Sequence, residues 1–551
     1  MLFSSYEFIF LFLPVVVISY FVLGRLGGRT PAHVWLVFAS TGFYALSRVH
    51  GLALILPSIV VDYLIGRGLE RVDESKRALR ASLLGVGVAA NIAFLGYFKY
   101  RNFFLHATNV LFGTHLAFGP LIPPLGVSFI TFQKIAYLVD IYTRQIKAGG
   151  LLDFLLFTLF FPRVVAGPIV HYQEVMPQLS RPTFRWVYTD VAVALCLFSI
   201  GLFKKVVIAD RLGDFANPVF AAPLQGEAVT MLSGWTGALA YTFQIYFDFS
   251  GYSDMALGVA RIFGVVLPMN FNSPLKASSI LEFWSRWHIT LTRFLTAYVY
   301  TPLLLRMTRR RMARGKPVLR GRSSEMSAIV MLIGVPTVLT MTLCGFWHGV
   351  GLHFIVWGIL HGLMLTTNQA WRTLRPRFWR DQASHDRVMR PVGFVLTFSA
   401  VVVTFVFFRA SSVTAAISIL GGMAGLNGVT VPYAVGLRLG AFGQWLERIG
   451  VTYDWSSGSQ FITSFVWLAV LFVVVTTIPN SLELLSPYRP ALDFQRPEAD
   501  ATDPHGAGRA VGRLGLLDIV RSRLGPPLVA ALAVAGVLGL HRVRAFLYWQ
   551  F

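Results

Sequence analysis

The stretch MSAIVMLIGVPTVLTMTLCGFWHGVGLHFIVWGILHGLMLTTNQAW, residues 326–371, decides the fold class. It contains two apolar runs, over about 326–346 and 350–370, joined by a short glycine-containing turn that carries His348. Each run is long enough to cross a bilayer core of roughly 30 Å as a helix that rises about 1.5 Å per residue. The sequence therefore predicts a membrane-embedded helical hairpin with His348 at its turn.

The segments on either side of this hairpin are strongly basic. Residues 306–322 carry eight Lys and Arg and no acid, and residues 372–390 carry six Arg against two Asp. Because basic loops face the cytoplasm, we expect His348 to lie deep in the protein or towards the outer face. The basic segments are expected to face anionic lipid, and a sharper reading adds the docking of an acidic carrier protein or of coenzyme A phosphates. The net charge of +22 does not predict nucleic-acid binding, because it lies in loops between apolar runs.

Apolar runs recur along the whole chain, of which 55% is hydrophobic and only 13% is charged. The expected membrane segments lie near 6–24, 33–48, 51–66, 82–98, 121–141, 151–170, 187–209, 231–250, 284–305, 326–346, 350–370, 391–409, 462–479 and 526–541. Some are short or broken by Gly or Pro, so we expect a polytopic all-α membrane protein with about 11–13 membrane helices and re-entrant segments.

The chain is expected to form a single membrane-embedded domain over residues 1–551, with a motif-bearing core over about 120–371. A mobile polar loop is expected over about 486–525, which is rich in Pro, Gly, Arg and Asp. A smaller extramembrane element is expected over 424–461.

Histidines near the hairpin turn are the first candidates for chemistry, because a polar group inside a membrane segment is costly and is often functional. His348 can titrate near neutrality, as a general base requires. The alternative is a structural histidine that caps the turn beside Trp347. A nucleophile pair with Cys344, one helical turn earlier, is less favoured. His353 and His361 are expected to be structural, and since no carboxylate joins them, no metal site is predicted.

A second candidate cluster is FWSRWHIT, residues 283–290, which contains Trp287 and His288. Polar residues continue beyond it, so this helix is expected to pack inside the protein or to line a wet cavity. The alternative is an aromatic belt at the membrane interface.

A third cluster, QIYFDFSGYSD, places Asp248 and Asp254 in an apolar run. Both carboxylates need partners there, and Arg261 and Arg286 are the expected ones. Gly251 is expected to break the helix so that backbone groups face a cavity. A buried ion pair that holds helices in register is the alternative to a catalytic role.

Several segments follow one another in a characteristic order along the chain. They are PLGVSF (124–129) with TFQ just after it, FPRVVAGPI (161–169), GLFKKVVIADRL (201–212), QIYFDFSGYSDMALG (244–258), NFNSP (270–274), EFWSRWHITLT (282–292), GFWHGVG (345–351) and FLYWQF (546–551). Together they resemble the membrane-bound O-acyltransferase (MBOAT) family, in particular its bacterial branch typified by alginate O-acetylase.

The resemblance implies two functional histidines, His348 in the WHG motif and His288 in the RWH motif. His348 corresponds to the principal catalytic residue, at the junction of an outer cavity and a narrow central tunnel from the cytoplasm. The candidates for contact with substrate or for lining the tunnel are Trp347, Trp287, Asp248, Asp254 and Arg286.

The resemblance also implies a function. A cytoplasmic thioester donor, acetyl-CoA or another acyl thioester, would supply an acyl group to hydroxyls of an exported polysaccharide such as alginate. No bound cofactor is expected. The expected setting is the bacterial inner membrane, with membrane lipid and an esterase-like periplasmic acetylation partner. Transfer of D-alanyl or another acyl group to teichoic acid or peptidoglycan is the alternative within enzymes, and a transporter with an Asp and His proton relay is a distant one.

Overall fold

The computed structural model describes residues 1–117, 119, 121, 123–319, 325–375, 378–379, 381–494, 525–542 and 544–547. Helices make up 76% of the structure, which confirms the predicted all-α class. Residues 495–524 of the polar loop predicted over 486–525 lie outside the described residues.

The chain forms two compact units, and each combines segments that are distant in sequence. The first unit consists of Met1–Val206, Phe249–Asn270 and Ser481–Phe551, and the second of Val207–Asp248 and Phe271–Asn480. That all residues form one domain stays a prediction.

In the described residues of the first unit the regular secondary structure is helical. Its helices are α1 (Leu13–Gly27), α2 (Arg29–Arg71), α3 (Arg77–Leu95), α4 (Arg101–Phe112), α5 (Val127–Tyr142), α6 (Leu151–Leu159), α7 (Tyr172–Ser180), α8 (Tyr188–Phe203), α22 (Ser481–Leu484), α24 (Gly525–Leu538) and the second half of α10 (Met231–Ile262). The break predicted between segments 33–48 and 51–66 is wrong, because α2 runs through both. A single glycine costs a helix interior only about 1 kcal/mol, and packing against α1, α3, α5 and α6 outweighs that cost.

A buried ion pair connects three helices of the first unit. Lys134 Nζ of α5 lies 2.9 Å from Asp62 Oδ2 of α2, and both side chains are 2% exposed. Asn91 of α3 donates to the other oxygen of Asp62 at 2.7 Å, and Lys134 donates to Ser58 at 3.0 Å. These hydrogen bonds satisfy charges that are costly to bury and fix the three helices in register. The sequence analysis did not identify this pair.

α10 does not break at Gly251, so that prediction is wrong. A Cβ at Gly251 would lie 2.7 Å from the backbone oxygen of Gly201 in α8. The glycine therefore serves the close approach of two helices rather than a kink. Asp248, one turn earlier on α10, is 1% exposed and belongs to the second unit.

The second unit carries both candidate histidines. Its elements are α9 (Asp210–Ala221), the first half of α10, α11 (Ile280–Arg286), α12 (Ile289–Leu295), α13 (Thr301–Ala313), α14 (Met326–Ile329), α15 (Val335–His348), α16 (Leu352–Leu374), α17 (Gln382–Arg409), α18 (Val413–Met423), β1 (Val429–Pro432), α19 (Tyr433–Arg438), α20 (Ala441–Arg448), β2 (Val451–Asp454) and α21 (Gly458–Thr477).

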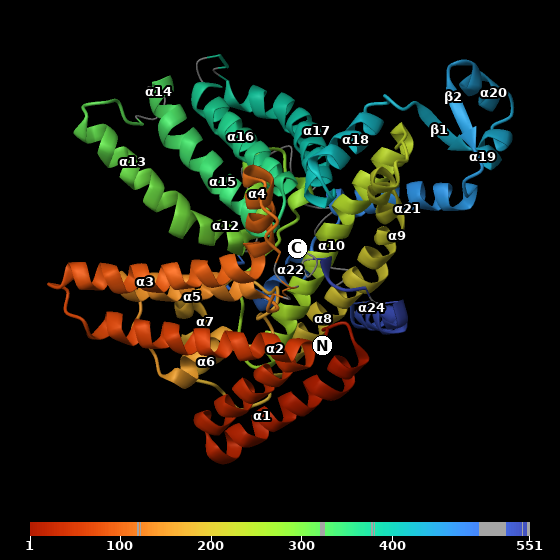
Figure 1. The fold of residues 1–551 in the computed structure, drawn as a ribbon. Helices are drawn as coiled ribbons and strands as arrows, with labels where there is room; N and C mark the ends of the chain where they lie inside the picture. The colour runs from red at the N-terminus through yellow and green to blue at the C-terminus, as the bar shows by residue number, and fades with distance from the viewer. Residues whose placement is uncertain are drawn as a thin grey trace. The chain divides into compact units, whose positions relative to one another are not determined.

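The predicted hairpin is confirmed as α15 and α16, which run side by side (Figure 1). Glycines allow their backbones to touch. A Cβ at Gly345 would overlap the backbone oxygen of Phe354, and one at Gly358 would overlap the backbone oxygen of Met341. Gly345 therefore serves contact between the two helices.

Residues 424–461 form a small folded element. Its expected place outside the membrane stays a prediction. β1 and β2 pair in parallel, with Val429 opposite Val451 and Pro432 opposite Asp454. α19 and α20 connect them. Among the described residues these are the two strands, so they are a small exception to an all-helical fold.

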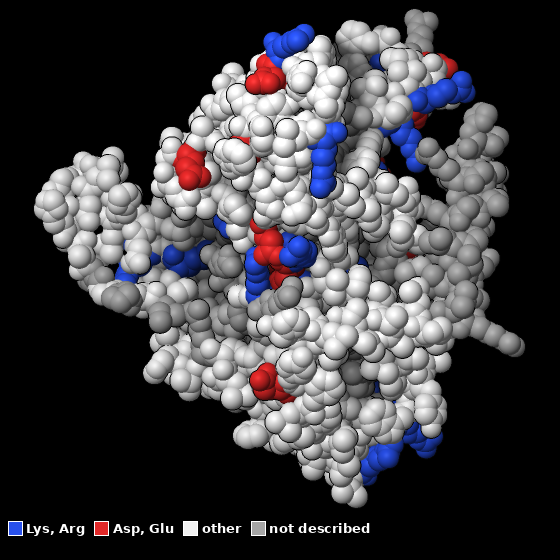
Figure 2. Space-filling model, turned by 90° about the vertical axis from the view of Figure 1, so that its right-hand side faces the viewer, with Lys and Arg blue, Asp and Glu red and all other residues white. Residues whose placement is uncertain are grey.

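Seven helices of the described chain are long and apolar enough to cross a membrane. They are Phe8–Gly27, Val49–Arg71, Arg77–Phe112, Tyr188–Gln225, Met326–His348, Gln382–Arg409 and Gly458–Thr477. Figure 2 shows a largely uncharged face on which the charged side chains form a few small groups, one of them near the centre. The protein is thus a polytopic helical membrane protein. The count of 11–13 crossings stays a prediction, because α16 and several shorter helices are not among the seven.

Because the backbones of α15 and α16 touch at Gly358, adding a single methyl group there should destabilise the protein. We expect Gly358→Ala to lower the free energy of unfolding by about 1–3 kcal/mol, because the backbone of α15 cannot move aside as a side chain would. Thermal unfolding in detergent would measure the change.

Gly85→Ala in α3 is the matched control, since no described atom outside its own helix lies within 4 Å of that Cβ. There the substitution should be neutral or stabilise the helix by up to about 1 kcal/mol. Equal effects of the two substitutions would contradict the tight packing of the hairpin.

Candidate active site

His348 is the last residue of α15 and is 4% exposed. Gly349–Gly351 form the turn that follows, and α16 begins at Leu352. A Cβ at Gly349 would overlap the ring of Phe354, so glycine leaves room for this ring beside the turn. The predicted position of His348 at the turn of the hairpin is confirmed.

Aromatic rings from three helices surround His348. The ring of Trp347 lies 4.7 Å from it, that of Trp357 of α16 at 5.3 Å, and that of Phe408 of α17 at 5.1 Å, centroid to centroid. The planes of His348 and Trp357 are almost perpendicular, at 89°. Packing on several sides fixes the imidazole in one orientation and keeps bulk water away from it.

His361 lies one helical turn beyond Trp357 on α16 and is fully buried. Trp284 of α11 donates its indole N–H to Nδ1 of His361 at 3.1 Å. The ring of His361 lies 4.7 Å from that of Trp357, so these three side chains continue the aromatic cluster from α16 to α11. The contact with Trp357, which also touches His348, joins His361 to the cluster around His348. The structural role predicted for His361 stays a prediction.

His288 occupies the break between α11 and α12 and is fully buried. Its φ of 44° puts it in the left-handed region, which a residue with a Cβ adopts at a cost of about 1–3 kcal/mol. Its carbonyl accepts from the backbone N–H groups of Leu291 and Thr292 and so starts α12. The membrane segment predicted over 284–305 is therefore interrupted at its beginning.

A continuous series of rings leads from His288 towards the other histidine. The ring of His288 lies 6.4 Å from that of Phe271, which lies 5.1 Å from that of Trp287. Trp287 in turn contacts Phe405 of α17 at 5.3 Å. Phe405 lies 6.3 Å from Phe408, the ring that touches His348. The structure thus brings His348, Trp347, His288 and Trp287 into one aromatic cluster.

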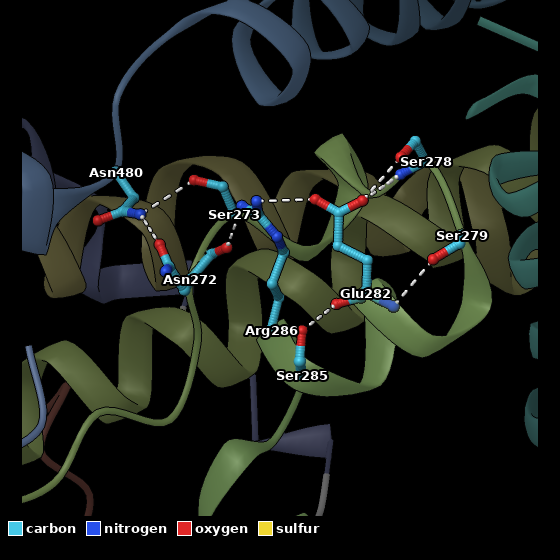
Figure 3. Close-up of polar contacts among 8 residues, drawn as sticks. All are labelled: Asn272, Ser273, Ser278, Ser279, Glu282, Ser285, Arg286 and Asn480. Carbon is cyan, nitrogen blue, oxygen red and sulfur yellow. Dashed lines mark hydrogen bonds and ion pairs between the residues drawn. The ribbon is translucent and has the colours of Figure 1, made fainter. Parts of the chain in front are cut away.

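Arg286 belongs to a polar network at α11 (Figure 3). Its Nη2 lies 2.8 Å from Glu282 Oε1, and its Nη1 donates to the carbonyl of Asn272 at 3.3 Å. Ser278 donates to the other oxygen of Glu282 through its backbone N–H and its hydroxyl, both at 2.8 Å. Asn480 holds the side chain of Asn272 at 3.0 Å. The network fixes the start of α11 and the loop before it.

Asp254 lies in the first unit, where Lys204 and Ser481 bind it at 2.7 and 2.8 Å. Arg261 pairs instead with Asp190 at 2.7 Å. The expectation that Arg261 or Arg286 would pair with the aspartates of this run is therefore wrong. The basic partner of Asp254 is Lys204, which comes from a different helical segment. Periodicity within one stretch of sequence does not show such a pairing.

In the described part of the chain, no group of three or more His, Cys, Asp or Glu side chains is arranged to hold a metal ion.

Comparison with known proteins identifies the scaffold on which these histidines lie. Residues 133–315 match the profile of the membrane-bound O-acyltransferase family. The Peptidoglycan O-acetyltransferase of Helicobacter pylori is 38% identical over 459 residues, which cover 78% of this chain and 81% of that protein.

The chain belongs to the membrane-bound O-acyltransferase family.

Other relatives of this O-acyltransferase carry different names. The Probable alginate O-acetylase AlgI of Pseudomonas aeruginosa is 36% identical over 424 residues, 76% of this chain and 73% of its own. The Teichoic acid D-alanyltransferase of Streptococcus thermophilus is 27% identical over 293 residues, 52% of this chain and 68% of its own. The resemblance stated from the sequence is confirmed, and with it the assignment of the chain as a multi-pass membrane O-acyltransferase.

Sequence reasoning about this O-acyltransferase missed Trp357 as part of the cluster. Trp284 was in the predicted cluster over 283–290, but its contact with His361 was not predicted. The signal that was present is the pair of i, i+4 positions, Trp357 and His361, which lie on one face of a helix. Only the packing of α11 against α16 shows that Trp284 meets that face.

The network at Arg286 predicts a structural effect of its loss. We expect Glu282→Ala to cost more stability than Arg286→Ala, because it removes the acceptor of two hydrogen bonds from Ser278, each worth about 1 kcal/mol, besides the ion pair. Both variants should lower the rate of acyl transfer by displacing α11, with little change in the KM of the acyl donor. A rise in that KM in Arg286→Ala alone would show that Arg286 binds the donor.

The backbone of His288 predicts a separation of stability from activity. Asn tolerates the left-handed region better than Ala does. His288→Asn should therefore unfold close to the wild-type temperature, whereas His288→Ala should be less stable by about 1 kcal/mol. Both should lose acyl transfer if the imidazole takes part. Full activity in the folded Asn variant would exclude that role.

Proposed function

We propose that this protein transfers an acetyl group, or another acyl group, from a cytoplasmic thioester to hydroxyls of a cell-envelope glycan. The observation that carries the proposal is the position of His348. It is a buried histidine at the turn of a hairpin, and its aromatic surroundings extend to a second buried histidine, His288.

The position of His348 along the helices supports transfer towards the outer face. α17 starts at Gln382 within the basic stretch 372–390 and reaches His348 with Phe408. At about 1.5 Å per residue, the part of α17 from Arg390, the last Arg of that stretch, to Phe408 is roughly 27 Å long, close to the thickness of a bilayer core. Basic loops face the cytoplasm, so His348 lies towards the opposite side.

In the proposed mechanism His348 acts as general base. It takes the proton of the acceptor hydroxyl while the hydroxyl oxygen attacks the thioester carbonyl carbon, a role that typically contributes about 10²–10⁴-fold. His288 orients the donor or stabilises the developing negative charge by a hydrogen bond. Trp347 and Trp287 wall the passage, and the exclusion of water limits hydrolysis of the thioester.

The remaining tunnel candidates take different parts in this proposal. Arg286 and Asp254 have ion partners within hydrogen-bond distance, which supports structural roles for them. Asp248 is buried in the second unit, the unit that carries both histidines, and stays a candidate for the passage.

The names of the relatives support a glycan acceptor, since peptidoglycan and alginate both carry free hydroxyls. Acetyl-CoA is the donor that we propose, presented at the cytoplasmic face, where basic residues of α13 suit its phosphates. The setting is then the inner membrane of a bacterium, and an esterase-like periplasmic protein is the proposed partner.

The test is transfer from radiolabelled acetyl-CoA to cell-envelope material at matched membrane expression. We expect label in a glycan fraction with wild-type protein, and loss of at least about 10²-fold in His348→Ala, the contribution typical of a positioned base. Cys344→Ala, one turn earlier on α15, is the matched control and should keep nearly all activity.

Each other outcome has a distinct meaning. Full transfer by His348→Ala would reject the proposed base, and loss in Cys344→Ala would favour a thiol nucleophile. If the wild-type protein transfers nothing from acetyl-CoA, the donor is wrong. A carrier-bound D-alanyl group then becomes the donor to try, in line with the name of the more distant relative.

A further inference from the structure

Two buried N–H groups on α16, in the aromatic cluster that contains His348, have no acceptor among the described residues. The side chains of Trp357 and His361 are 1% and 0% exposed. Among the described residues, neither Trp357 Nε1 nor His361 Nε2 has a hydrogen-bond partner. Buried donors are nearly always paired in folded proteins, so two such groups in one cluster point to a partner that binds during function.

The hydrogen bond from Trp284 defines the protonation of His361. An indole N–H can only donate, so Nδ1 of His361 must accept with its lone pair. A neutral imidazole then carries its proton on Nε2. His361 is therefore held as a donor at the nitrogen that has no partner, and Trp284 is the residue that holds it so.

The two donors belong to one face of one helix. Trp357 and His361 are four residues apart on α16, and their rings are 4.7 Å apart. Trp357 also contacts His348 edge to face at 5.3 Å. Trp357 thus lies next to the proposed base, and His361 follows one turn further along a helix held by backbone contact with the helix of that base.

The chemistry of the surroundings selects the ligand group. The neighbouring side chains are aromatic, and such a site disfavours phosphates and other full charges. A carbonyl oxygen is neutral, offers two lone pairs and brings no donor of its own. It also gains negative charge during acyl transfer, and a preorganised pair of donors stabilises that charge most strongly in the transition state.

We propose that Trp357 Nε1–H and His361 Nε2–H together bind the carbonyl oxygen of the acyl thioester and stabilise the oxyanion that forms on it. This inference rests on the proposed acyl-transfer function and names the residues that hold the reacting carbonyl. Trp284 acts through His361 and is a positioning residue.

The bonds in this step balance. The acceptor hydroxyl oxygen forms a bond to the carbonyl carbon as His348 takes the hydroxyl proton, and the carbonyl electron pair moves onto the oxygen held by the two donors. The oxyanion then collapses, the carbon–sulfur bond breaks, and the thiolate leaves with the proton from His348. The products are the ester and the free thiol, and His348 is neutral again.

The test uses the full-length protein in detergent or vesicles. We expect Trp357→Phe to lower kcat by about 10²–10³-fold with little change in the KM for acetyl-CoA, because one oxyanion donor is lost. Its melting temperature should stay close to the wild-type value, because a donor without a protein partner is replaced by an apolar ring. His361→Phe should behave alike, whereas His361→Gln, which can still accept from Trp284 and donate, should keep more activity. Trp371→Phe near the end of α16, where the side chain is 40% exposed, is the matched control.

A spectroscopic measurement tests the contact directly. Acetyl-CoA with a carbon-13 carbonyl is bound to His348→Ala protein, which cannot turn it over. Hydrogen bonds lower the carbonyl stretching frequency, so we expect a higher frequency when Trp357→Phe or His361→Phe is added to this background.

The outcomes separate this inference from the proposed function. If the wild-type protein labels no envelope material, the function itself fails. If the wild-type protein is active and His348→Ala inactive, yet Trp357→Phe keeps its kcat and the carbonyl frequency does not change, only the inference is overturned. The N–H groups would then bind ordered water.

Discussion

The candidate site depends on direct contact between the backbones of α15 and α16. The contact exists because Gly345 and Gly358 have no Cβ at the positions where the helices meet. It brings Trp357 against the end of α15, where His348 lies. A wider separation of these helices would leave His348 without its perpendicular neighbour and would open the cluster to water.

The apolar surroundings of this cluster determine how strongly its few polar groups interact. In a medium from which water is excluded, a hydrogen bond to a developing charge is strong and an unmet donor is costly. Few polar atoms are therefore needed, and each must be held in place. Trp284 orients His361, the turn of the hairpin orients His348, and the break before α12 orients His288.

The sequence predicted the parts of this site that depend on local pattern. The hairpin and the position of His348 follow from two apolar runs between basic segments, because length and charge are properties of a continuous stretch. The break at His288 could not be predicted in the same way, since no Gly or Pro lies near it to mark a helix end. The partner of Asp254 was missed because Lys204 comes from a segment 50 residues away in the chain.

Residues with no distinctive chemistry were the hardest to assign. Trp357 looks like any aromatic residue in a membrane helix, and only its distances to His348 and His361 give it a role. Lys134 and Asp62 are distant in sequence and pair through packing of α2 and α5. The roles of Trp357, Lys134 and Asp62 can therefore be assigned only from their tertiary contacts.

The left-handed backbone of His288 also bears on how such enzymes diverge after gene duplication. Few residues with a side chain accept that conformation, and Asn and Asp are the main ones besides His. A copy that drifts to either of them keeps the junction of α11 and α12 while it loses the imidazole. If His288 has the role proposed above, such a copy would be a stable membrane protein without acyl-transfer activity. Drift to a β-branched residue would instead strain this junction, because such residues rarely adopt the left-handed region.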